Sequence, residues 1–290
     1  MRHTRKSVRK FKEMDEIEKY VIRAIQKRNH SPVDDFEGYS PDEMQVILYN
    51  FFDSKCVVQF KKANDKIYDS IPILNQIKFL CDIILENGEL NLTKTGRLPI
   101  KTVAQIYNEG YLKDEGIEQG ISKLYKEEGI QTMELTRILL ELSQIVKKRN
   151  NKLSITANGK KLIANNHSLF IHIFEIFSTK FNWSYFDGYD NEEVGQIGIG
   201  FSLILLDKYG SDFKSTNFYA NKYLKAFSFE ANNEDIVTDN QKAYSLRTFD
   251  RFLEYFGLVK LTNKRFGETS KVKTTSLFKK LIKVRPHNNV

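Results

Sequence analysis

Apolar residues recur at helical spacing in the first part of the chain. They predict one helix over residues 14–26 and another over residues 41–52. Ser40 and Glu43 stand three residues apart at the start of the second helix, which is the spacing of a capping box. The apolar residues 57–60 have no helical period and predict a short strand.

The middle of the chain shows the same order of elements twice. A helix over residues 74–85 and a helix over residues 135–146 are each followed by a turn and one short strand. Each strand continues into the pattern L-x-(L/I)-T-x-(T/N)-G-(R/K), where Thr93 and Thr156 are expected to cap a following helix. The two predicted strands are residues 90–92 and 153–155. The order suggests two partial modules, each with a single strand.

An aromatic run, HSLFIHIFEIFSTKFNWSYF, begins at His167. Aromatic rings can stack on nucleic-acid bases, but these residues repeat at helical spacing. The run therefore predicts a helix buried in the core rather than a binding surface. The repeating residues are Leu169, Phe170, Ile173, Phe174, Ile176 and Phe177.

The last hundred residues change from a helical period to a strand period. Helices are predicted over residues 194–206, 215–227 and 243–256, followed by strands at 258–261 and 271–274. Three helices followed by a two-stranded hairpin is the order of a winged helix-turn-helix.

The segment AYSLRTFDRFLEYFGLVKL resembles the third helix and first wing strand of bacterial winged-helix regulators. LTKTGRL and LTNKRF are similar to the exit from such a wing into a helix. This resemblance covers residues 194–282, with partial echoes at 74–108 and 135–165. Separately, DFEGYSPDEMQ together with LTKTGRLP resembles a group of bacterial proteins with no assigned activity.

These elements predict a mainly α fold with small β-hairpins, in three parts. Residues 1–70 form a basic arm and an N-terminal helical region. Residues 71–165 form the helix-strand repeat region, which is partly winged-helix-like. Residues 166–290 form a helical segment and the winged helix-turn-helix domain.

The net charge of +8 is concentrated at the two ends of the chain. Residues 1–30 carry 10 Lys and Arg against 4 Asp and Glu, and residues 260–290 carry 9 against 1. The residues between them therefore sum to −6. Basic ends on a mildly acidic body favour contact with a polyanion such as nucleic acid. A solvated basic tail without a partner is the alternative.

Composition argues against several other classes of protein. Cys56 and Cys81 lie in no CxxC pair and the five histidines are scattered, so neither a metal nor a cofactor is expected. No phosphate-binding loop, nucleophile elbow or dinucleotide motif occurs in the sequence, which indicates a protein that is not an enzyme. Without a long apolar stretch or a secretion signal, the expected location is the cytoplasm, away from membranes.

The acidic segment FDGYDNEEVG leaves one enzyme hypothesis open, a metal-dependent nuclease. That hypothesis requires Asp187, Asp190 and Glu193 to converge on one point. A simpler interpretation is that Asp190 caps the following helix and that the neighbouring glutamates favour its dipole.

The predicted function is non-catalytic binding of double-stranded DNA through the third helix and the wing, which allows a regulatory role. The alternative is a protein interaction scaffold built from winged-helix-like modules. Arg247 and Arg251 distinguish the two, because arginines that face the body or pair with its acidic residues favour the scaffold. The candidate DNA-binding residues are Lys242, Ser245, Arg247, Thr248, Arg251, Lys260, Lys264, Arg265, Lys271 and Lys273.

Overall fold

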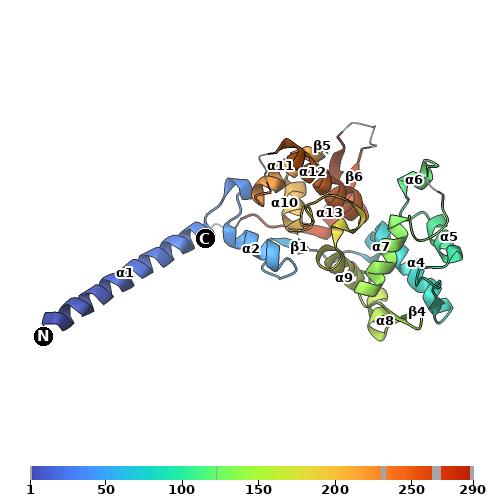
Figure 1. Ribbon diagram of the computed structural model, residues 1–290, viewed down its shortest axis with the longest axis horizontal. Coiled ribbons are helices and arrows are strands. Elements are labelled where there is room, and N and C mark those ends of the chain that lie inside the picture. The colour runs from blue at the N-terminus through green and yellow to red at the C-terminus, as the bar shows by residue number, and fades with distance from the viewer. Residues whose placement is uncertain (1, 122, 230–232, 263–268, 288–290) are drawn as a thin grey trace.

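The computed structural model describes residues 2–121, 123–229, 233–262 and 269–287 (Figure 1). Within these ranges the chain is mainly helical, with three small antiparallel sheets. The predicted fold class, mainly α with small β-hairpins, is confirmed at this level. None of the described helices combines the length and the apolar character that crossing a membrane requires.

The N-terminal region begins with a long helix that projects from the body, as Figure 1 shows. The predicted capping box is present, because the Ser40 hydroxyl accepts from the Glu43 backbone N–H while the Glu43 carboxylate accepts from the Ser40 backbone N–H. The elements are α1 (Arg2–His30), η1 (Asp34–Phe36), α2 (Pro41–Tyr49), β1 (Val58–Phe60) and α3 (Asp65–Tyr68).

The middle unit, residues 72–155, has the order helix, strand, two helical segments, helix and hairpin. Its three strands form an antiparallel sheet in the order β2-β4-β3. The elements are α4 (Pro72–Glu86), β2 (Leu90–Asn91), α5 (Ile100–Asn108), α6 (Glu115–Glu118), α7 (Gln131–Leu142), β3 (Val146–Arg149) and β4 (Lys152–Ile155).

This sheet corrects the prediction of two separate partial modules. The strands of the two predicted copies lie side by side, with Leu90 opposite Leu153. The helix predicted to reach residue 146 ends at Leu142 instead, because Gln144 takes a left-handed φ of 56° and the chain then enters β3. Both copies of the pattern therefore belong to one unit that has a complete hairpin.

The two predicted threonine caps differ in outcome. Thr156 caps α8 (Ala157–Ile163), accepting from the Gly159 backbone N–H at 2.8 Å. Thr93 caps no helix, because its hydroxyl accepts from the Arg97 backbone N–H within a turn and α5 begins only at residue 100.

The helix α9 (Asn166–Thr179) joins the middle unit to the rest of the chain. Phe174 lies 4.9 Å between ring centroids from both Phe252 and Phe256, which belong to the C-terminal part of the chain. All six repeating residues of the aromatic run are buried, so the prediction of a core helix is confirmed. The loop after α9 contains the short helix η2 (Trp183–Phe186).

The C-terminal unit, residues 199–274, repeats the architecture of the middle unit. Its sheet has the order β5-β7-β6, and its third helix α12 continues directly into the π-helix η3. Its elements are α10 (Ile199–Tyr209), β5 (Lys214–Ser215), α11 (Thr216–Ala226), α12 (Glu234–Tyr244), η3 (Ser245–Leu253), β6 (Val259–Leu261) and β7 (Lys271–Thr274). The first predicted helix starts at residue 199 rather than 194, and the third starts at 234 rather than 243.

The last elements return to the N-terminal region. After α13 (Ser276–Leu281), strand β8 (Ile282–Val284) pairs with β1, with Val58 opposite Val284. A second connection lies at Glu37, whose buried carboxylate accepts hydrogen bonds from Lys208, Lys222 and Tyr209 at 2.6 Å each. The N-terminal region is thus fastened to the C-terminal unit by backbone pairing and by a charge cluster.

Candidate functional site

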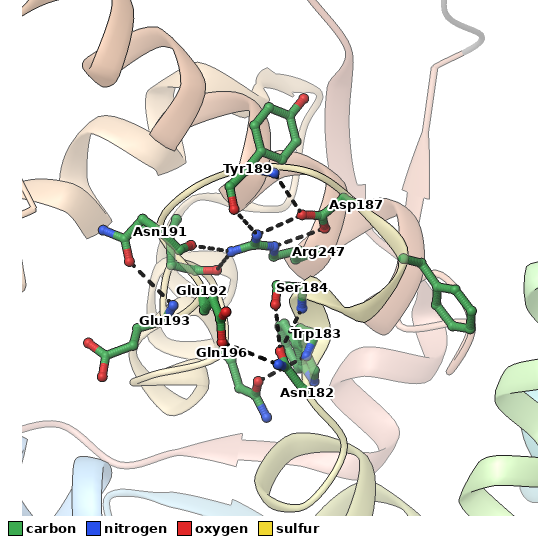
Figure 2. A network of polar contacts seen from close by, with 12 residues as sticks. Asn182, Trp183, Ser184, Asp187, Tyr189, Asn191, Glu192, Glu193, Gln196 and Arg247 are labelled. Carbon is green, nitrogen blue, oxygen red and sulfur yellow. Dashed lines mark hydrogen bonds and ion pairs between the residues drawn. The ribbon is translucent and has the colours of Figure 1, made fainter.

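Arg247, on η3 of the C-terminal unit, is buried and lies at the centre of a polar network with the loop before α10 (Figure 2). Its Nε and Nη2 atoms donate to the two carboxylate oxygens of Asp187 at 3.0 and 2.7 Å. Its remaining N–H groups donate to the carbonyl oxygens of Asn191 at 2.6 Å, Val194 at 3.1 Å and Tyr189 at 3.5 Å. A guanidinium carries five N–H donors, and here all five are used inside the protein.

The prediction that Arg247 contacts DNA is therefore corrected, because its role here is structural. Its side chain is 0% exposed, so it offers nothing to a groove of DNA. Thr248 is also buried, and its hydroxyl donates to the Gly195 carbonyl at 3.4 Å. Arg251 is 15% exposed and is held by Asp187 at 3.1 Å and by the Phe186 carbonyl at 3.0 Å. Both arginines meet the condition that favours the scaffold over DNA contact by this helix.

The acidic segment after η2 supplies this network and forms no metal site. Asp187 is 5% exposed and faces two arginines, so its charge is already balanced. The described residues contain no group of His, Cys, Asp and Glu side chains that could hold a metal ion. The expected cap by Asp190 is wrong, because α10 begins only after Gly198, which takes a left-handed φ of 65°. The sequence prediction started this helix too early, at residue 194, and missed the turns that precede Gly198.

The same loop is held from its other side by neutral hydrogen bonds. The Trp183 indole N–H donates to the Phe177 carbonyl at 2.7 Å, and the Gln196 amide donates to the Phe181 carbonyl at 2.7 Å. Tyr223 donates to the Ile197 carbonyl at 2.7 Å, and burial raises the pKa of this hydroxyl above its ordinary value of 10.0. Tyr223 therefore stays a protonated donor, and the loop is fixed along its length.

A groove of about 430 Å³ lies along the end of α12 and the start of η3. Lys242 and Ser245, two of the predicted residues, line it together with the first residues of α11. Ser270 also lines it, and its buried hydroxyl has no hydrogen-bond partner within the part of the chain that the structure describes. Lys242 is 58% exposed, but its ammonium group lies 3.5 Å from Asp239. The exposed start of α12 carries the acidic residues Glu234, Asp235 and Asp239.

The hairpin β6–β7 keeps the predicted wing lysines on one face. Lys260 lies directly opposite Lys273, and Lys271 lies two residues before Lys273 on the same strand. Lys260 and Lys271 are exposed, and the Lys273 ammonium group lies 4.7 Å from the centre of the Phe213 ring. Lys264 and Arg265, also predicted to contact DNA, lie outside the described residues.

The hairpin β3–β4 of the middle unit also has three cations on one face, with two of them on its first strand rather than on its second. Arg149 lies directly opposite Lys152, and Lys147 lies two residues before Arg149 on the same strand. All three side chains are exposed, and the Lys152 ammonium group lies 3.1 Å from the Glu89 carboxylate. The two-residue turn between the strands has left-handed φ values of 50° and 58°, as a tight type I′ hairpin requires.

Two cations directly across from each other destabilise a hairpin. Both hairpins nevertheless contain such a pair, Arg149 with Lys152 and Lys260 with Lys273. Each hairpin therefore holds two like charges side by side across its strands.

Comparison with family models, with curated proteins and with solved structures finds no match for this chain.

The sequence prediction missed the hairpin of the middle unit, although a signal for it is present. Between Glu141 and Glu175 the chain has no carboxylate but contains six Lys and Arg residues. The run Lys147-Lys148-Arg149 ends at Asn150-Asn151, and asparagine tolerates the left-handed conformation that a tight hairpin turn needs. The predicted helix extending to residue 146 hid this signal.

Proposed function

We propose that the chain is a non-catalytic nucleic-acid-binding protein that contacts the phosphate backbone of duplex DNA through its two basic hairpins. The observation that carries the proposal is the shared pattern of three cations on one face of each hairpin. In the middle unit these are Lys147, Arg149 and Lys152, and in the C-terminal unit they are Lys260, Lys271 and Lys273.

The architecture supports the same proposal. Both units have the order helix, strand, helical segments and hairpin, with the first strand paired to the last. This is the order expected of a winged helix-turn-helix, in which the hairpin is the wing. Because Arg247 is buried and the start of α12 is acidic, the proposed contact is made by the wings and carries little base specificity.

The proposal predicts a salt-dependent affinity that each hairpin shares. Each phosphate contact adds about 0.9 to the slope of log affinity against log salt. Lys147→Gln with Arg149→Gln, and separately Lys260→Gln with Lys271→Gln, should each flatten this slope by about 2. The measurement is fluorescence anisotropy of a labelled random-sequence duplex at several salt concentrations.

The matched control removes two exposed lysines from other elements, Lys66→Gln with Lys180→Gln. This variant has the same net charge as either hairpin variant, and its slope should stay at the wild-type value. Equal slopes in all four proteins would contradict the proposal. No binding by the wild-type protein at low salt would contradict it as well.

The second candidate function is a protein interaction scaffold. It is favoured by the two arginines, which face Asp187 instead of solvent, and by the acidic exposed start of α12. A scaffold of this kind would leave the duplex unbound at low salt. The same titration therefore separates the two functions.

A further inference from the structure

The helix α1 leaves the body of the protein with an apolar face uncovered. Ile17, Tyr20, Val21 and Ile25 are 63%, 74%, 46% and 53% exposed. Their spacing of three, four and eight residues places them on one stripe of the helix. Figure 1 shows this helix projecting away from the other elements, and the four side chains of the stripe are all exposed. Monomeric proteins rarely expose a continuous apolar stripe of this kind.

Two opposite charges lie beside the Tyr20 edge of the stripe. Glu16 is four residues before Tyr20 and Lys27 is seven residues after it, so the two lie on the same flank of the helix, three turns apart. A parallel pair of such helices would place acidic residues against acidic residues. An antiparallel pair places the acidic part of each helix against the basic part of the other.

We infer that α1 pairs in antiparallel orientation with α1 of a second copy of this chain, and that the two helices cross at Val21. Val21 is the midpoint between Ile17 and Ile25, so a crossing there sets Ile17 of each copy beside Ile25 of the other. The same crossing brings Glu16 next to Lys27 of the second copy. The contact is isologous, so it closes into a dimer with two-fold symmetry.

The base of α1 lies against the body of its own copy. His30 lies 3.1 Å from Asp42 of α2, and the Ser31 hydroxyl donates to the Lys27 carbonyl at 2.6 Å where the helix ends. Residues 17–25 of the stripe come before this contact along the helix and are exposed.

The first test is the oligomeric state of the full chain, measured by sedimentation velocity over a wide range of concentration. The wild-type protein should form a dimer as concentration rises, and Val21→Glu should stay monomeric. Ile22→Glu is the matched control, because Ile22 is also 46% exposed but lies about 140° around the helix from Ile17, which is near the middle of the stripe. A wild-type monomer at every concentration, or equal loss in both variants, would overturn the inference.

The second test is the orientation of the two helices. Val21→Cys should form a disulfide-linked dimer by itself, whereas Ile17→Cys should crosslink only when it is mixed with Ile25→Cys. The native Cys56 and Cys81 are both buried and do not compete. Crosslinking of Ile17→Cys to itself would indicate a parallel pair and refute the proposed geometry. Dimers that disappear after nuclease treatment would show bridging by nucleic acid and would refute the pairing of α1. Dimers that persist after nuclease treatment support the pairing whether or not the protein binds DNA, so this test is independent of the proposed function.

Discussion

Replacement of Arg247 tests whether the buried network is structural. Breaking a buried ion pair by removing one partner costs about 3–5 kcal/mol, because it leaves polar groups without partners. In Arg247→Ala the Asp187 carboxylate retains Arg251, but the carbonyls of Asn191 and Val194 lose their donor. We therefore expect the free energy of unfolding to fall by about 3–4 kcal/mol, within the range for buried pairs.

The neighbouring substitutions set an order that checks the reasoning. Asp187→Ala should cost more, about 4–5 kcal/mol, because it leaves two guanidinium groups facing each other without a carboxylate. Arg247→Lys should cost about 2 kcal/mol, because an ammonium group cannot reproduce the planar fork. Arg251→Ala should cost only about 1–2 kcal/mol, because this side chain is partly exposed and makes two contacts.

Urea denaturation followed by tryptophan fluorescence measures these differences. Trp183 is the single tryptophan of the chain, it is buried, and its ring lies 4.4 Å from that of Phe252. It therefore reports the loop that Arg247 holds. If Arg247→Ala unfolded within about 1 kcal/mol of the wild type, the network would not be what fixes this loop. A loss of duplex binding in that variant would then need an explanation other than unfolding.

Two further substitutions test the connections around the sheets. Burial raises the pKa of Glu37, but hydrogen bonds from two lysines and Tyr209 lower it by more than burial raises it. The pKa therefore lies below its ordinary value of 4.5. A carboxyl of lowered pKa stabilises the fold above that ordinary value and loses this contribution as the pH falls through its folded pKa. Urea unfolding at neutral and acidic pH should therefore show Glu37→Gln to be less stable at neutral pH, with the difference shrinking in acid. Gly159→Ala should lower the thermal midpoint by the equivalent of about 1–3 kcal/mol, because its Cβ would collide with the Ile145 carbonyl, whereas Gly188→Ala meets nothing within 4 Å and should unfold like the wild type.

The long helices of this fold follow from the sequence, but the sheets do so only in part. Helix α9 could be predicted because its buried residues recur at helical spacing within one short segment of the sequence. Strands β5 and β8 have two and three residues, and each exists because it pairs with a strand far away in the chain. Such short strands carry no period of their own. They therefore could not be predicted from the pattern of apolar residues.

The buried position of Arg247 could not be predicted for a related reason. Arginine is usually exposed, and a regular helical period places Arg247 on the polar side of its helix. The structure continues α12 into the π-helix η3, whose wider turn shifts the following residues around the axis. The partner carboxylate, Asp187, lies sixty residues earlier in a loop. Neither the change of helix type nor the distant partner is visible in the local sequence.

Dimerisation through α1 and duplex binding by the hairpins together predict a result that neither predicts alone. A dimer through α1 carries four basic hairpins, so a long duplex that reaches hairpins of both copies is held by linked contacts. Val21→Glu should then weaken binding to a long duplex more than binding to a short one. The salt slope on the short duplex should be unchanged, because each hairpin keeps its cations. Weakening that is equal for both lengths would mean that α1 contacts the duplex itself.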